Sequence, residues 1–310
     1  MEWYYAICLL FGMIIGLMLL GMPVAIAFLA SNIVGAYLFF GGTIGITQML
    51  NNGFGAMTNF SLVPIPMFLL MGELFYHTGL GQRMFNAIDR LFGSIPGRLA
   101  YVTVAGGTGF AALSGSSMGS TALLGSLMVP EMMKRGYNKY LSIGPILGTG
   151  GLAVIIPPSA LAVLLATLGK TDVAALLIAG IIPGLILATM YFTLIALWTV
   201  LDPSAAPGYD GEKVSTGEKI RLVLVDIMPL VGAIVLTIGV MVSGWATPTE
   251  AAAIGCVAVL VLAILFRCLT WQAIKASING SLRVTVMAFL IIFGSAGSAR
   301  SWRSRAPRPA

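Results

Sequence analysis

The chain has 310 residues, of which 58% are hydrophobic and only 9% are charged. A soluble domain carries about 25% charged residues, so this composition excludes a soluble globular protein and indicates an integral membrane protein. The formal net charge of +6 does not suggest a nucleic-acid partner, because Arg300, Arg303, Arg305 and Arg308 crowd the end of the chain and the rest is nearly neutral.

Charged residues are absent from long stretches of the chain, and each stretch is a candidate membrane segment. Asp, Glu, Lys and Arg are missing from residues 3–72, 99–130, 140–169, 173–201 and 227–249. A spanning helix needs about 20 mostly apolar residues, so these stretches predict roughly seven or eight helices that cross or enter the membrane. Glycine and proline are frequent in the early stretches, which favours a helical bundle over barrel strands.

The N-terminal region, residues 1–78, contains three predicted spans. They are expected at about 4–20, 23–40 and 61–77. The uncharged segment between the second and third spans is rich in glycine and asparagine, so we expect it at an interface. Glu73 and His77 end the third span at i,i+4 spacing, which indicates a partner pair at the level of the lipid head groups rather than a proton relay.

The second region, residues 79–201, begins with an amphipathic basic segment and an uncharged run. Basic segments flank that run, residues 99–130, at both ends. Short basic loops favour the cytoplasm, so both ends of the run are expected on one side of the membrane. The run is long for one span but fits two half-helices. We therefore predict a re-entrant hairpin over 97–130, with the polar residues 114–117 at its tip.

The next apolar run, residues 140–169, carries several helix-breaking residues. These are Gly148, Gly150 and Gly151, followed by Pro157 and Pro158. Proline removes a backbone donor and clashes with the preceding turn, and glycine loosens the backbone. The pattern predicts a discontinuous helix whose break lies within 148–159. A span over 173–200 completes this region.

A polar loop over 202–221 leads to a last apolar region, residues 222–296. Two spans are expected there, followed by a further apolar segment; they cover 222–243, 250–266 and the residues from Leu282 onward. The sequence predicts a helix start with a capping box after the polar loop. Thr247 would be the N-cap, Pro248 the first helical residue and Glu250 the acidic residue of the box. Residues 297–310 contain Arg, Ser, Pro and Ala with few apolar residues, so we expect disorder there. Their abrupt change of composition also suggests out-of-frame translation.

The two predicted breaks suggest a binding site. Unwound backbone survives in a membrane only where it is buried in protein or lines a cavity. Its carbonyls and nearby hydroxyls suit a hard cation, and half-helix N-termini attract anions. Neither break carries a charged side chain, so backbone and hydroxyl dipoles would hold the ion, which favours sodium over a proton relay. The alternative for the hairpin cluster is close helix packing by small residues.

Other classes of function fit less well. An intramembrane serine hydrolase needs a base, and the single histidine, His77, lies at the end of a span. The sequence has no phosphate-binding glycine loop, and its three cysteines show no metal spacing. We therefore expect no enzymatic activity, no catalytic residues and no cofactor or structural metal.

Four segments in order carry a family resemblance: GMPVAIAF at 21–28, SGSSMGSTA at 114–122, GLAVIIPPS at 151–159 and TPTEAAA at 247–253. Together they resemble the large membrane subunit of the tripartite ATP-independent periplasmic (TRAP) transporters, over about residues 5–296. The resemblance implies an all-α, polytopic membrane protein of the elevator type, built from inverted repeats, in which 79–201 is the first transport module. It also implies a sodium symporter for organic acids such as dicarboxylates in the bacterial inner membrane. The implied partners are a periplasmic substrate-binding protein, a small four-helix membrane subunit, a small organic anion and the lipid bilayer.

The resemblance also assigns roles to residues of the two breaks. Sodium would be bound by Ser114 and Ser117 at the hairpin tip and by carbonyls near Gly151, Val154 and Pro157. Ser116 and Ser159 would contact the substrate carboxylate. The chain reaches only the opening of the second repeat, so we expect it to be truncated at its C-terminal end. The alternative function is therefore a non-transporting remnant or a helical docking subunit.

Overall fold

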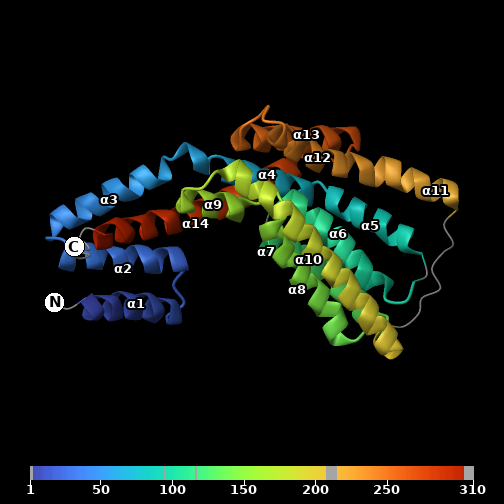
Figure 1. Cartoon of the computed structure of the whole chain (residues 1–310), viewed down its shortest axis with the longest axis horizontal. Helices are drawn as coiled ribbons and strands as arrows, with labels where there is room; N and C mark the ends of the chain where they lie inside the picture. The colour runs from blue at the N-terminus through green and yellow to red at the C-terminus, as the bar shows by residue number, and fades with distance from the viewer. Residues whose placement is uncertain (1–2, 94, 116, 207–214, 304–310) are drawn as a thin grey trace. The chain divides into compact units, whose positions relative to one another are not determined.

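The computed structural model describes residues 3–93, 95–115, 117–206 and 215–303 (Figure 1). Among these, the side chains of Trp3, Leu113, Ser114, Met118 and residues 296–303 are not described. Every regular element in the described part of the chain is a helix. The predicted all-α fold is confirmed.

Several of these helices are long and apolar enough to cross a membrane. In the described ranges five qualify: Phe60–His77, Val173–Leu201, Thr216–Val242, Pro248–Leu265 and Trp271–Ser295. Lys139–Ile155 and Ala160–Gly169 qualify together as a sixth, bent by 46° at a short break. The chain is therefore a multi-pass helical membrane protein.

The chain divides into two compact units, and the first comprises residues 1–62 and 282–310. It holds α1 (Trp3–Leu19), α2 (Val24–Phe39), α3 (Thr43–Met57) and the short η1 (Phe60–Leu62). The Ser31 hydroxyl of α2 donates to the carbonyl of Leu10 at 3.0 Å, which ties α2 to α1. The Asn32 amide donates to the Gly294 carbonyl at 2.5 Å and ties α2 to the last helix. The first two predicted spans correspond to α1 and α2.

The last helix, α14 (Trp271–Arg303), corrects two expectations. It begins at Trp271, well before Leu282, because its first turns mix polar and apolar residues and a search for apolar runs misses them. Its backbone continues through residues 297–303, where disorder was expected. Alanine and arginine favour a helix, and the first proline of the tail is Pro307. Residues 304–310 lie outside the described part of the chain.

The second unit, residues 63–281, begins with α4 (Pro64–His77) and α5 (Leu80–Phe92). α5 is the predicted amphipathic segment, and it buries Leu80, Met84 and Phe85 on one face. It leads into α6 (Arg98–Ser114), which turns at Gly115 into α7 (Ser117–Lys134). The chain thus folds back near the middle of the uncharged run, as expected; entry of both helices from one side of the membrane stays a prediction.

The discontinuous helix is present, but its break is shorter than expected. α8 (Lys139–Ile155) runs without interruption through Gly148, Gly150 and Gly151, and α9 begins at Ala160. Only residues 156–159 leave the helix, and the Pro157–Pro158 peptide is cis. Gly148 and Gly150 have neighbouring helices packed against them and stay helical, as does the exposed Gly151. A glycine keeps its backbone N–H, whereas two successive prolines remove two donors from the ladder.

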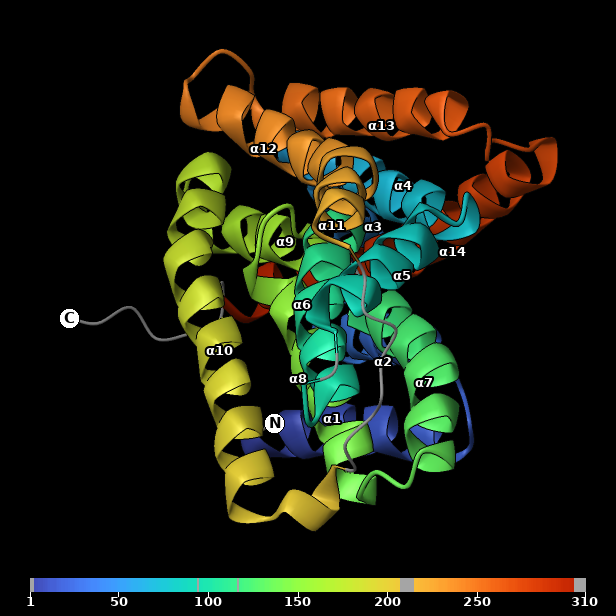
Figure 2. The ribbon, with the colours of Figure 1, turned by 90° about the vertical axis from the view of Figure 1, so that its right-hand side faces the viewer.

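Helix α10 (Val173–Leu201) packs along α8, and the short η2 (Pro203–Ala205) follows it. After the loop come α11 (Thr216–Arg221), a π-helical stretch η3 (Leu222–Ile227), α12 (Met228–Val242) and α13 (Pro248–Leu265). Figures 1 and 2 show α12 and α13 side by side, and they are in contact. The predicted capping box is confirmed: the Thr247 hydroxyl accepts from the Glu250 N–H, and the Glu250 carboxylate accepts from the Thr247 N–H.

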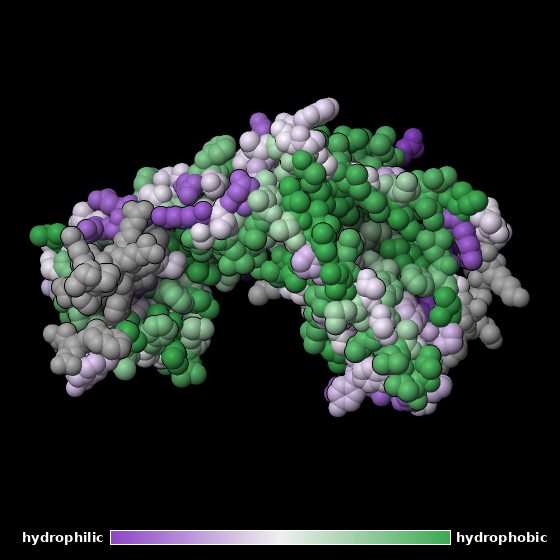
Figure 3. Space-filling model, viewed as in Figure 1, coloured by the Kyte–Doolittle hydropathy of each residue, from purple (hydrophilic) through white to green (hydrophobic). Residues whose placement is uncertain are grey.

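Large apolar side chains are exposed along these helices. Ile182, Met190 and Leu194 of α10 are more than half exposed. Figure 3 shows such apolar residues in green over much of the visible surface. An extensive apolar exterior is the surface that a bilayer covers.

Candidate functional site

The hairpin tip touches the break between α8 and α9. Gly115 is buried in the left-handed conformation, with φ of 55°. A Cβ at this position would lie 3.0 Å from the Pro158 carbonyl oxygen and 3.5 Å from the Ala160 nitrogen. Glycine therefore serves both the turn and the close approach, and the two predicted breaks form one site.

Four helix ends meet at this contact. α6 and α8 end here with their carboxyl termini, and α7 and α9 begin here with their amino termini. The last carbonyls of a helix carry partial negative charge and the first N–H groups carry partial positive charge. Pro157 and Pro158 have no N–H, so the carbonyls of Ala153 and Val154 also lose their helical donors. The site thus offers oxygens to a cation and N–H groups to an anion.

The first turn of α7 packs closely against α8 at Gly150. A Cβ at Gly150 would overlap the Thr121 hydroxyl and would lie 3.5 Å from the Ser117 carbonyl oxygen. The Thr121 hydroxyl itself donates to that carbonyl at 2.8 Å. Sequence reasoning noted Gly150 only as a helix breaker, and it missed Thr121. The glycine cluster was the one available signal that another helix comes close.

Farther from the hairpin tip, small residues also allow α6 and α8 to pack closely. A Cβ at Gly107 of α6 would lie 2.9 Å from the buried Thr149 of α8. A core of small and branched residues joins α6, α8 and α10: Ala111, Ala112, Leu152, Ala153, Ile156 and Ala188. Tight packing of this kind leaves the hairpin tip and the break little freedom to move apart.

Three of the predicted sodium ligands lie at the meeting point. Ser117 is the first residue of α7 and is half-buried, Val154 lies in the last turn of α8, and Pro157 is buried in the break. Ser114 ends α6, but its side chain lies outside the description. Ser116, a predicted substrate contact, lies outside the described residues.

Two further predicted site residues, Gly151 and Ser159, are not placed as open ligands of the site. Gly151 is exposed, and a Cβ there would meet no described atom within 4 Å, so Gly150 rather than Gly151 faces α7. The carbonyl of Gly151 stands four residues before the end of α8, within the helical ladder. Ser159 is fully buried as the N-cap of α9, and its hydroxyl accepts from the Ala162 N–H at 3.3 Å. A substrate contact at Ser159 stays a prediction.

The site carries no formal charge from its own segments. Residues 99–130 and 140–169 contain no Asp, Glu, Lys, Arg or His. Among the residues that the structure describes, no three His, Cys, Asp or Glu side chains gather as a metal site. An ion bound here would depend on backbone and hydroxyl dipoles.

Charged residues instead hold the base of the hairpin. The Arg98 guanidinium donates to Asp89 at 2.8 and 2.5 Å and to the Gly93 carbonyl at 2.8 Å. The Tyr137 hydroxyl accepts from the Leu99 N–H at 3.4 Å. Burial raises the pKa of the Tyr137 hydroxyl. These contacts fix the beginning of α6 relative to α5 and to the start of α8.

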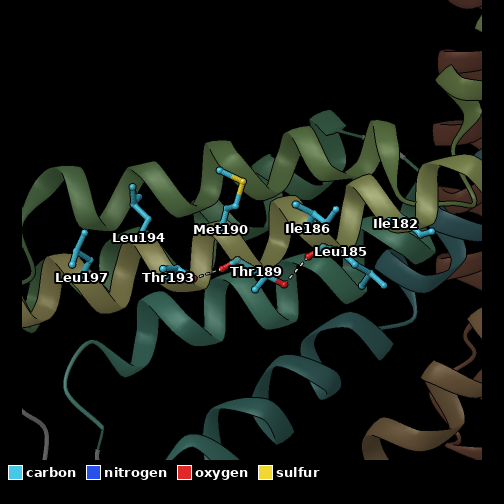
Figure 4. Close-up of a pocket in the computed structure, with 8 residues that line it drawn as sticks. All are labelled: Ile182, Leu185, Ile186, Thr189, Met190, Thr193, Leu194 and Leu197. Carbon is cyan, nitrogen blue, oxygen red and sulfur yellow. Dashed lines mark hydrogen bonds between the residues drawn. The ribbon is translucent and has the colours of Figure 1, made fainter.

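A depression of about 580 Å³ on α10 is less suited to a polar ligand (Figure 4). Its lining is almost wholly apolar and comes from α10 alone. Its two hydroxyls, those of Thr189 and Thr193, donate to carbonyls of the same helix at 2.8 and 2.9 Å. This face matches a surface turned toward lipid.

Known proteins are similar to this chain over most of its length. Residues 11–301 match the family model described as tripartite ATP-independent periplasmic transporter, DctM component. The chain is 32% identical over 290 residues to the ectoine TRAP transporter large permease protein TeaC of Halomonas elongata, covering 93% of this chain and 66% of that protein. It is 30% identical over 299 residues to the C4-dicarboxylate TRAP transporter large permease protein DctM of Rhodobacter capsulatus, covering 92% and 66%.

A third relative is the sialic acid TRAP transporter large permease protein SiaM of Vibrio cholerae. It is 28% identical over 286 residues, covering 90% of this chain and 64% of that protein. The chain thus spans about two thirds of the length of these relatives.

Proposed function

Because the chain belongs to the DctM family of tripartite ATP-independent periplasmic transporters, we propose that it is the membrane subunit of a sodium-coupled importer of organic acids. The observation that carries this proposal is the contact of Gly115 with Pro158, which brings four helix ends to one buried point. Converging broken helices are the arrangement in which secondary transporters hold substrate and coupling ion.

The oxygen atoms available to a cation at this site support sodium as the coupling ion. The available groups are the freed carbonyls of Ala153 and Val154, the carbonyl of Pro157 and the Ser117 hydroxyl. They are neutral oxygens, which suit a hard monovalent cation. The uncharged segments around the site supply no carboxylate to relay a proton.

A carboxylate is the substrate group that the two helix N-termini support. The starts of α7 and α9 place partial positive charge at the site, which attracts an anion. The names of the relatives mention ectoine, C4-dicarboxylates and sialic acid, and each of these compounds carries a carboxylate. We therefore propose an organic acid as the substrate class.

The family resemblance supplies the partners in this proposal. A periplasmic binding protein would deliver the acid, and a small membrane subunit would complete the transporter in the bacterial inner membrane. A relative from Oleidesulfovibrio alaskensis named as the isethionate TRAP transporter permease protein DctMQ supports a second membrane component, because its name joins two. The hairpin and α8–α10 would move together as the transport module of an elevator.

Uptake into proteoliposomes tests the proposal. Vesicles would contain this chain with the small membrane subunit and the binding protein, and radiolabelled succinate, ectoine and sialic acid would serve as probes. We expect an inward sodium gradient to drive uptake of at least one probe, and a potassium gradient of equal size to drive none. Equal uptake with both gradients would contradict sodium coupling. No uptake of any probe would favour the alternative, a docking or non-transporting subunit.

A further inference from the structure

The first half of α10 covers the break between α8 and α9, and two glycines make the contact. Gly180 and Gly184 are four residues apart, so they share one face of the helix. The carbonyl oxygen of Ile155 occupies the space that a Cβ at Gly180 would need. A Cβ at Gly184 would lie 2.5 Å from Ile156 Cγ1. The backbone of α10 therefore rests on the last residue of α8 and the first residue of the break.

Some glycines of the same unit make no such contact. A Cβ at Gly144 on α8, or at Gly232 or Gly239 on α12, would meet no described atom within 4 Å. A glycine inside a helix is less favourable than an alanine. At Gly180 the backbone of α10 lies too close to the Ile155 carbonyl oxygen for a Cβ, and at Gly184 it lies too close to the Ile156 side chain.

Ile155 and Ile156, which α10 contacts, lie beside the carbonyls of the proposed ion site, so their positions affect where these carbonyls lie. Ile155 and Ile156 directly precede the two prolines, and Val154 lies in the same last turn of α8. A shift of this turn moves the freed carbonyls relative to the hairpin tip. Ligand sets tolerate only about 0.5 Å of misplacement before affinity falls. Helix α10 can thus tune the site without contributing a ligand.

We propose that Gly180 and Gly184 are positioning residues of the cation site: they seat α10 against Ile155 and Ile156 and thereby set the place of the neighbouring carbonyls. This inference rests on the proposed sodium site. It assigns α10, which supplies none of the predicted ligands, an influence on ion affinity that acts through Ile155 and Ile156.

Thermal unfolding of the purified chain in detergent tests this inference. Sodium chloride would replace potassium chloride at constant ionic strength, and the readout is the sodium concentration that gives half of the maximal rise in Tm. Outer residues that orient metal ligands affect affinity by about 10- to 100-fold, so we expect Gly184→Ala to raise this concentration about tenfold. Gly144→Ala, the matched control, should leave it within twofold.

A second substitution separates positioning from a general loss of folding. Ile156→Ala removes the atom that a Cβ at Gly184 would meet, so the double variant Gly184→Ala/Ile156→Ala should recover sodium affinity to within about threefold of the parent. Gly180→Ala meets a backbone oxygen, and Ile156→Ala should not rescue it. Full sodium affinity in Gly184→Ala, or equal rescue of both glycine variants, would overturn the inference alone. A parent chain that sodium does not stabilise would overturn the proposed sodium site as well.

Discussion

Gly115 at the tip of the hairpin lies against the carbonyl oxygen of Pro158 in the broken helix, so closely that a Cβ at Gly115 would approach this oxygen to 3.0 Å. This one relationship joins two polar interruptions that are more than forty residues apart in the sequence. It converts a turn and a helix break into a single buried site. The proposed function depends on it.

Gly115→Ala should destabilise the protein. A left-handed conformation costs a residue with a Cβ about 1–2 kcal/mol, and the contact with Pro158 adds steric conflict. We expect a lower Tm in thermal unfolding followed by circular dichroism. Gly125→Ala on α7 is the matched control: its Cβ would meet no described atom within 4 Å, and its Tm should be unchanged or higher. Equal stability of the two variants would contradict the close contact.

Removing Arg98 from the ion pair at the hairpin base should cost far more stability than removing an arginine from an exposed pair. The Arg98 side chain is 9% exposed, whereas Arg90, which pairs with Glu218 at 3.2 Å, is 51% exposed. Removing one partner of a buried pair costs about 3 kcal/mol, and an exposed pair is worth less than about 1 kcal/mol. Arg98→Ala should therefore lower the free energy of unfolding several times more than Arg90→Ala. Similar losses in denaturant titrations would argue against a structural role for the Arg98–Asp89 pair.

Tyr137 gives the hairpin base a dependence on alkaline pH. Burial raises the pKa of its hydroxyl above the ordinary value of 10.0, so folding favours the neutral form. This contribution to stability is present below about pH 10 and is lost as the pH rises through the raised pKa. Unfolding measured from pH 8 to pH 12 should show a steeper loss for the parent than for Tyr137→Phe. Parallel curves would show that the hydroxyl ionises equally in both states.

If α6 and α7 form a re-entrant hairpin, both ends of the hairpin face one side of the membrane. Ile95 is 49% exposed and Lys134 is exposed, so cysteines at these positions can react with a thiol reagent. Cys8, Cys256 and Cys268 would first be replaced by serine or alanine. Ile95→Cys and Lys134→Cys should react with a membrane-impermeant maleimide in vesicles of the same orientation. Labelling from opposite sides would mean that the run crosses the membrane once.

Much of the fold could be predicted because the segments of a membrane protein that lie in the bilayer are apolar, and its charged residues gather between them. The uncharged runs predict α1, α2 and α10 to within a few residues, and the basic flanks predict that the chain turns near Gly115. The capping box at Thr247 is a local signal, and it was found for that reason. The start of α14 was missed because its first turns are only partly apolar.

The geometry of the site could be predicted only in part. Pro157 and Pro158 locate the break because proline lacks an N–H wherever it stands. The glycines before them do not break the helix, since the fate of a helical glycine depends on what packs against it. Gly150 receives Thr121 from α7, a contact between segments that local sequence does not pair. The family resemblance implies a carbonyl near Gly151, and local sequence does not indicate that its neighbour Gly150 is the glycine that faces α7.

The most direct test of the account is sodium-specific stabilisation of the purified chain. Sodium at ten times its Kd stabilises a single site by about 1.4 kcal/mol, which corresponds to a rise in Tm of about 3 °C for a chain of this size. We expect this rise when sodium chloride replaces potassium chloride at equal concentration, and we expect Ser117→Ala to lose more than half of it. The same Tm in both salts would contradict a sodium site between the hairpin tip and the broken helix.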